Sequence, residues 1–184
     1  FLEEMWSRNL GHLFVSPLRP HEMIMALMTI SFIRTVIGIV PATILALIFF
    51  GFSVYSLGIP LIGFFLNLIV MGWAIGLVMS GLVLRFGLGA ESLAWVAVFA
   101  LAPISGIYYP IDVLPGWLQV VAFAIPASHV FEGMRAILID GGYRADLMWN
   151  AILLNGLYLA LGCGAFFSFF RTARVRGLLL NLGE

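Results

Sequence analysis

Four long apolar stretches dominate the chain and are separated by short polar or charged connections. They run over residues 23–52, 59–84, 93–109 and 147–170. A helix that crosses a bilayer needs roughly 20 apolar residues, and the first, second and fourth stretches provide them. The third stretch is short before Pro103. The pattern predicts an all-α polytopic membrane protein with four transmembrane helices, in which residues 1–184 form a single transmembrane domain.

Residues 1–16 have a different pattern, that of a short amphipathic helix. Apolar side chains recur there at steps of three and four residues, which places them on one stripe of a helix. The members of this stripe are Leu2, Met5, Trp6, Leu10, Leu13 and Phe14. Ser16 and Pro17 end the pattern, because proline lacks a backbone donor and disfavours helix in the residue before it. The segment is either a contact surface for a cytosolic partner or an anchor on the membrane surface.

Composition supports the membrane assignment and excludes several classes of function. The chain is 62% hydrophobic and 10% charged, with nine arginines, no lysine and a net charge of zero. A chain with no net positive charge is a poor partner for nucleic acid. The single cysteine, Cys163, lies in an apolar run, so neither a disulfide framework nor a metal cluster is expected. His129 and Glu132 lie one helical turn apart, but a metal ion needs more ligands, and both are interpreted as surface polarity.

The arginines predict how the chain is oriented, because short loops rich in arginine stay on the cytoplasmic side. Six arginines would share one side: Arg8, Arg19, Arg85, Arg171, Arg174 and Arg176. Arg135 and Arg144 would lie on the opposite side, among four acidic residues. With an even number of spans, both chain ends then lie in the cytosol, the tail 171–184 included, and the segment 103–140 lies outside.

The apolar segment 101–138 carries four prolines, namely Pro103, Pro110, Pro115 and Pro126. One straight helix cannot hold that many interior prolines. Non-helical backbone at membrane depth must pack against protein or line a wet cavity. We therefore expect an external re-entrant helical hairpin over 103–140, with Trp117 at the membrane interface. The alternative is an amphipathic loop that lies on the bilayer.

Few polar side chains fall within the predicted spans. Arg34 lies roughly 16 Å along its helix from Met23. Charged residues in spans usually face a bundle interior or a cavity, so Arg34 is a candidate contact for an anionic headgroup. Alternatively, the span begins near Thr29 and Arg34 reaches back to the cytosolic interface. Asn67 and Asn155 are interpreted as ties between helices.

Small residues spaced by four mark two candidate helix contacts. They are Gly72, Gly76 and Ser80 on one span, and Gly156, Ala160 and Gly164 on another. Such faces let helices approach each other closely, although glycine is common in membrane helices in any case. Both interpretations stay open.

Several short motifs occur in an order that resembles the permease subunit of type-2 ABC exporters. The opening helix ends in SPL at residues 16–18, PISGIYYPIDVLPGW follows at residues 103–117, and Pro126 and Arg135 come later. The resemblance covers the last four of the family's usual six spans. The chain, which starts at Phe1, is therefore interpreted as lacking the first two spans.

The resemblance implies roles for two groups of residues. The opening helix, residues 1–18, corresponds to the coupling helix that docks on the family's nucleotide-binding ATPase. Its matching residues are Glu3, Glu4, Arg8, Asn9, Leu10, Ser16 and Pro17. The re-entrant hairpin is matched by Pro103, Ser105, Gly106, Tyr109, Pro110, Pro115, Trp117 and Pro126. Arg135 matches an arginine that commonly follows, and with Arg34 it is a candidate contact for the transport path or a lipid headgroup.

No nucleotide-binding or hydrolytic motif occurs in the chain: it has no P-loop, no HExxH and no useful Ser/His/Asp grouping. We therefore expect no enzymatic activity and no bound cofactor, with ATP and Mg held by a partner ATPase. The leading interpretation is the permease subunit of an ATP-driven ABC exporter in a bacterial inner membrane, in contact with membrane lipid and a second permease copy. The alternative is a structural or assembly membrane protein that binds a cytosolic partner through residues 1–16.

Overall fold

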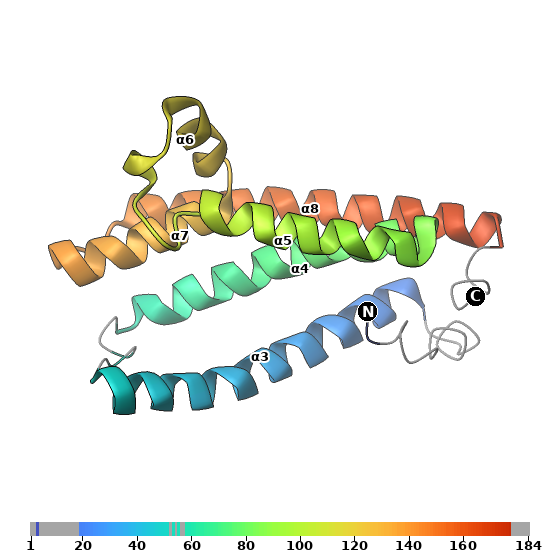
Figure 1. Cartoon of the computed structure of the whole chain (residues 1–184). Helices are drawn as coiled ribbons and strands as arrows, with labels where there is room; N and C mark the ends of the chain where they lie inside the picture. The colour runs from blue at the N-terminus through green and yellow to red at the C-terminus, as the bar shows by residue number, and fades with distance from the viewer. Residues whose placement is uncertain (1–2, 4–18, 52, 54, 56–57, 178–184) are drawn as a thin grey trace.

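The computed structural model describes residues 3, 19–51, 53, 55 and 58–177. Six α-helices run through these residues: α3 (Pro20–Phe50), α4 (Pro60–Phe86), α5 (Glu91–Ile104), α6 (Gly116–Phe123), α7 (Pro126–Arg135) and α8 (Ala145–Val175) (Figure 1). Shorter helical turns, η2 (Gly87–Ala90), η3 (Ile111–Val113) and η4 (Ala136–Asp140), join or extend them. The described residues contain no β-strand. The prediction of an all-α polytopic membrane protein is confirmed.

Three helices, α3, α4 and α8, are long and apolar enough to cross a membrane. A fourth candidate is the pair formed by α6 and the continuous α7–η4 helix, which are bent by 99° at a short break. The predicted third span, 93–109, differs from the structure because α5 ends at Ile104 after 14 residues. Pro103 lies in its last turn, and Gly106 then takes a left-handed φ of 72° that no helix continues.

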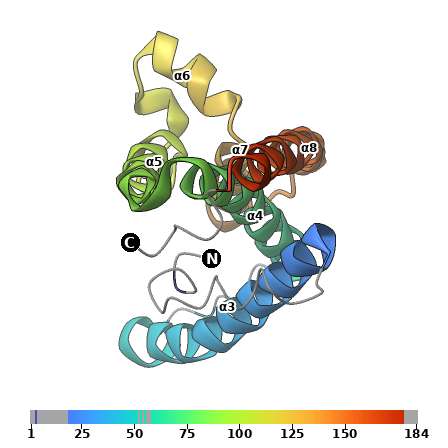
Figure 2. The same ribbon diagram turned by 90° about the vertical axis from the view of Figure 1, so that its right-hand side faces the viewer.

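The centre of the bundle is the pair α4 and α8, which run in the same direction side by side (Figures 1 and 2). Gly162 of α8 makes the closest approach, because a Cβ built on it would lie 2.7 Å from the carbonyl oxygen of Ala74 on α4. Phe64 and Phe166 are fully buried on either side of this contact along the helices. The helix pair therefore meets backbone against backbone at Gly162.

The two small-residue ladders are not the surfaces through which α4 and α8 approach each other. A Cβ built on any of the four ladder glycines, Gly72, Gly76, Gly156 and Gly164, would find no atom within 4 Å. The glycines at which α4 and α8 meet closely are instead Gly63, Gly81 and Gly162. Of the two readings of the ladders, the structure therefore favours the plain abundance of glycine.

The prediction that two asparagines tie helices together is confirmed. The Nδ2 of Asn155 on α8 donates to the side-chain oxygen of Asn67 on α4 at 2.8 Å and to its backbone oxygen at 3.0 Å. Both residues are buried. Hydrogen bonds of this kind are favourable within an apolar bundle, because the alternative is an amide without a partner.

Helix α3 lies apart from the other helices over most of its length (Figure 2). Only Met23 and Ile24 of α3 are buried, and both belong to a core cluster with Leu77, Leu84 and Phe166. Near its other end, a cavity of about 370 Å³ lies between Ile39 and Thr43 of α3 and Leu61 and Phe65 of α4. Against the other described helices, α3 therefore buries side chains in its first turns.

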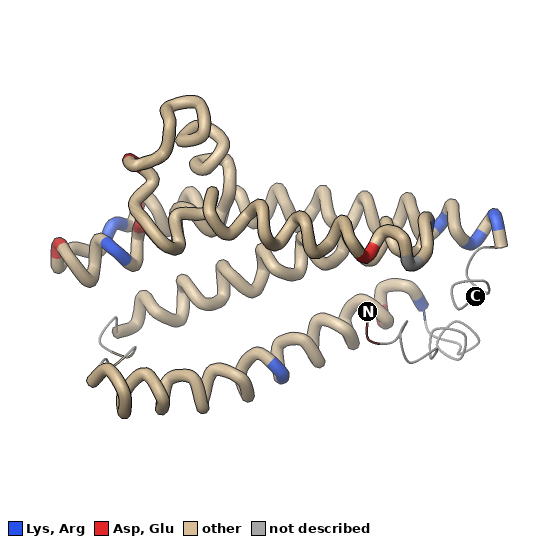
Figure 3. The backbone as a smooth tube through the Cα atoms, in the orientation of Figure 1, with Lys and Arg blue, Asp and Glu red and all other residues tan. Residues whose placement is uncertain are grey.

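Charged residues lie mostly toward the two ends of the bundle (Figure 3). Arg19 precedes α3, whereas Arg85 and Arg174 lie in the last turns of α4 and α8. Because α3 runs opposite to α4 and α8 (Figure 1), these arginines share one end, as the predicted orientation requires. The assignment of that end to the cytosol stays a prediction.

Candidate functional site at the outer segment

The outer segment, residues 105–144, links the end of α5 to the start of α8. Its part up to α6 stands clear of the bundle, whereas α7 lies against α4 and α8 (Figure 1). Three of the prolines noted in the sequence each precede or begin a helix. Pro110 precedes η3, Pro115 precedes α6, and Pro126 is the first residue of α7. Proline suits these positions because its φ is already helical and the first turn needs no backbone donor. The prolines thus divide the segment into short helices, as expected from the sequence.

Local packing holds the first part of the outer segment together. Ile111, Leu114 and Ala122 form a small buried cluster, against which Tyr109 and Leu118 pack. The side-chain amide of Gln119 donates to the carbonyl oxygen of Leu114 at 2.8 Å. Ser105 is buried, and its hydroxyl donates to Ala102. Trp117, by contrast, is 72% exposed, which suits the interfacial position expected for it.

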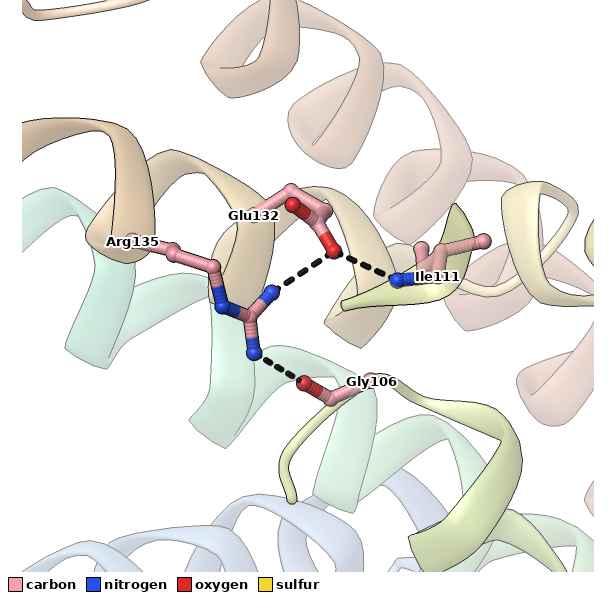
Figure 4. A network of polar contacts seen from close by, with 4 residues as sticks. All are labelled: Gly106, Ile111, Glu132 and Arg135. Carbon is pink, nitrogen blue, oxygen red and sulfur yellow. Dashed lines mark hydrogen bonds and ion pairs between the residues drawn. The ribbon is translucent and has the colours of Figure 1, made fainter. Parts of the chain in front are cut away.

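A polar clamp of Glu132 and Arg135 fastens this part of the segment to α7 (Figure 4). Oε1 of Glu132 accepts hydrogen bonds from the backbone N–H of Ile111 at 2.9 Å and from Nη1 of Arg135 at 2.6 Å. Nη2 of Arg135 donates to the carbonyl oxygen of Gly106 at 2.8 Å. Both charged side chains are only about a fifth exposed, at 23% and 21%. One ion pair therefore reaches two backbone groups that lie more than twenty residues earlier in the chain.

The clamp changes the interpretation of two residues. Glu132 was expected to be a polar residue at the surface. Its side chain is instead half-buried and accepts hydrogen bonds from Ile111 and Arg135. His129 was also expected at the surface, yet it is 6% exposed and its Nε2 lies 2.8 Å from the carbonyl oxygen of Phe123. That expectation was wrong because α7 packs against both α4 and α8, which leaves it little free surface. The spacing of three residues between Glu132 and Arg135 was the available signal, since it places both on one helix face.

Gly106 is the tightest point of the clamp. Its φ of 72° is a conformation that residues with a Cβ rarely adopt. A Cβ there would also lie 3.1 Å from Cγ1 of Ile111 and 3.7 Å from Oε1 of Glu132. Only glycine therefore presents its carbonyl oxygen to Arg135 without strain.

We expect Gly106→Ala to lower the free energy of unfolding by about 1–2 kcal/mol, because the left-handed φ is strained for alanine. The measurement is denaturant unfolding of the purified protein in detergent. Gly141 also has a positive φ, of 68°, but no atom lies near its Cβ position, so Gly141→Ala reports the backbone strain alone. A loss no larger for Gly106→Ala than for Gly141→Ala would show that the contact with Ile111 adds nothing.

The candidate coupling residues lie outside the described residues, except Glu3. The Glu3 carboxylate accepts hydrogen bonds from both terminal nitrogens of Arg34, one of them at 3.3 Å. The neighbouring guanidinium holds the pKa of Glu3 below its usual range. Arg34 therefore has a carboxylate partner in the structure, and neither expected contact, a headgroup or the cytosolic interface, is tested. Arg135 likewise donates hydrogen bonds to Glu132 and Gly106. Its role as a contact for a transport path or a lipid headgroup stays a prediction.

Within the described residues, no group of three or more His, Cys, Asp or Glu side chains could hold a metal ion. The outer segment carries apolar contacts and a single clamp of opposite charges. Such an arrangement sets the position of a loop and its short helices.

Comparison with known proteins identifies related sequences. The chain matches the ABC-2 type transporter family over residues 2–139. It is 24% identical over 152 residues to the "Probable multidrug ABC transporter permease YbhR" of Escherichia coli K12, and equally to the protein of that name from E. coli O157:H7. Each alignment covers 78% of this chain and 39% of the relative, so the chain spans about two fifths of the relatives' length. No solved structure matches the chain.

Proposed function

Because the chain belongs to the ABC-2 type transporter family, we propose that it acts in the permease subunit of an ATP-driven exporter and is driven by a separate ATPase. It is an integral membrane protein, with three helices of spanning length among the described residues. The single observation that carries the proposal is the family match over residues 2–139, because this range runs from the start of the chain through α3, α4, α5, α6 and α7 into η4.

Energy transfer is the step that the proposal assigns to residues 1–18. Residues Glu4, Arg8, Asn9 and Leu10 would face the ATPase at the inner surface of the bacterial membrane, with both ends of this chain in the cytosol. Movement of the ATPase would then pass to α3, which follows the segment directly. ATP and Mg would be bound by the ATPase, since this chain carries no P-loop.

A second permease copy completes the proposed transporter. Four candidate spans leave little room for a path within one chain, so the path would lie between two copies. The outer segment, held by the Glu132–Arg135 clamp, would then stand at the outer mouth of that path. The cargo of the named relatives is described only as multidrug, and a hydrophobic cargo for this chain would be in keeping with its apolar helices.

The test is co-purification of the complete permease with its partner ATPase. We expect Glu4→Ala together with Arg8→Ala to reduce the bound ATPase about tenfold, the loss that corresponds to about 1.4 kcal/mol of binding free energy. Arg144→Ala is the matched control, because Arg144 lies at the opposite end of the bundle and pairs locally with Asp146. Retention of the ATPase and of coupled transport in the double variant would refute the docking assignment.

A further inference from the structure

A large apolar cavity opens between α4 and α8, on a surface that none of the proposed roles uses. Its volume is about 780 Å³, and its walls include Ile62, Leu66 and Val70 of α4 and Met148 and Ile152 of α8. Cavities of this size with apolar walls and few polar groups typically accept small molecules. The lining holds no charged side chain, so an ionic ligand has nothing to pair with there.

Asn155 and Asn67 are the two side-chain amides in this lining. Their hydrogen bonds leave one amide oxygen without a donor. Nδ2 of Asn155 faces two oxygens of Asn67, which only an N–H group can satisfy, and this fixes the orientation of the Asn155 amide. Nδ2 of Asn67 donates to the carbonyl oxygen of Gly63 at 2.8 Å. Oδ1 of Asn155 is buried and has no hydrogen-bond partner among the described residues. A buried acceptor without a donor is uncommon and calls for a ligand or a water molecule.

We propose that this cavity binds an apolar molecule carrying one hydroxyl group, which donates a hydrogen bond to Oδ1 of Asn155. The amide lies ten residues beyond Ala145, about 15 Å from the start of α8. At such a depth a hydroxyl also needs a protein partner, because none is available from hydrocarbon. A plain acyl chain fills the volume but offers no donor. Oδ1 of Asn155 has almost no exposed surface, so the ligand reaches it only after a neighbouring side chain moves aside. Met148 lines the cavity, and its Sδ accepts a hydrogen bond from Nδ2 of Asn67 at 3.4 Å. Its unbranched side chain can change rotamer to open that approach.

Photolabelling with 3-azioctanol and its hydroxyl-free analogue 3-azioctane tests the proposal. Both probes are apolar and differ in the single donor. The complete chain is labelled in lipid nanodiscs without ATPase, and the labelled residues are mapped by peptide mass spectrometry. We expect 3-azioctanol to label residues of the cavity wall, Met148 and Ile152 among them, about fivefold more than 3-azioctane does. We expect Asn155→Leu to abolish this difference between the probes.

A second variant keeps the test informative if Asn155→Leu destabilises the protein. Gly156 lines the cavity and has no atom within 4 Å of its Cβ position, so Gly156→Leu fills the cavity and leaves the asparagine pair intact. We expect it to reduce labelling of the cavity wall by both probes. Gly164→Leu is the matched control on the same helix, because it also has open space at its Cβ and lies outside this cavity.

Three results would overturn the proposal. They are equal labelling of the cavity wall by both probes, labelling spread evenly over the exposed faces of α3 and α8, and labelling unaffected by Gly156→Leu. The first of these would leave a buried water molecule as the partner of Asn155. The measurement involves neither ATP nor transport, so its failure is distinct from a failure of the proposed exporter function.

Discussion

Gly162→Ala is expected to lower the free energy of unfolding by about 2 kcal/mol, although alanine is the better helix former. The added Cβ would lie 2.7 Å from the backbone oxygen of Ala74 and 3.3 Å from its Cα. Backbone atoms cannot change rotamer, so α4 and α8 would have to separate, and overpacking of this kind typically costs about 1–3 kcal/mol. Separation would also stretch the hydrogen bonds between Asn155 and Asn67, two turns away on α8.

Gly164→Ala is the matched control, and its expected effect has the opposite sign. Nothing lies within 4 Å of its Cβ position, so the substitution adds helix propensity, worth up to about 1 kcal/mol, without a clash. Unfolding in a denaturing detergent, followed by circular dichroism, gives both values on one scale. Equal stability of the two variants would mean that the close approach of α4 and α8 contributes nothing to the fold.

Glu132→Gln is expected to lower the free energy of unfolding by about 1–2 kcal/mol and to loosen the outer segment. The substitution leaves the Arg135 guanidinium partly buried without a countercharge and weakens the acceptor for the Ile111 N–H. Hydrogen bonds to charged groups are worth about 1.5–3 kcal/mol, and the partial exposure of this pair reduces that value. Hydrogen exchange measured by mass spectrometry should show faster exchange in peptides that contain Ile111.

The Arg144–Asp146 pair provides the comparison for this experiment. It belongs to the same outer segment and the start of α8, but both side chains are more than half exposed. Arg144→Gln should therefore leave stability unchanged within the error of the measurement, because exposed ion pairs contribute little. Pairing Glu132→Gln with Arg135→Gln in a double-mutant cycle isolates the clamp itself. If the double variant merely showed the sum of the two single effects, Glu132 and Arg135 would not act as a unit.

The helical architecture could be predicted because long apolar stretches have few alternatives. The stretches at 23–52, 59–84 and 147–170 correspond to α3, α4 and α8, since a chain in hydrocarbon must satisfy its backbone hydrogen bonds internally. The division of the outer segment was also readable, because Pro110, Pro115 and Pro126 dictate where its helices start. Bounds were harder, as the end of α5 at Ile104 depends on the turn at Gly106.

Contacts between distant segments could not be read from spacing. The ladder at Gly72 and Gly76 has the pattern of a helix contact, yet the backbones of α4 and α8 approach most closely at Gly162. The rotation of α8 about its own axis is set by packing along its whole length, which the spacing of a few glycines does not reveal. The hydrogen bond from the Ile111 N–H to Glu132 could not be predicted either, because every residue except proline has a backbone N–H and the sequence does not mark which one is used. Both features depend on the tertiary arrangement of the helices, which cannot be deduced from the residue pattern of a single sequence.

Because α3 buries few side chains, reorienting it costs less free energy than reorienting α4 or α8. Its buried side chains, Met23 and Ile24, lie within its first two turns and thus act as a pivot. From Met28 onward about 22 residues, roughly 33 Å of helix, extend beyond that pivot. A tilt of about 10° would carry the far end through about 6 Å while the core between α4 and α8 stayed packed. Leverage of this kind turns a small push at one membrane surface into a large displacement at the other.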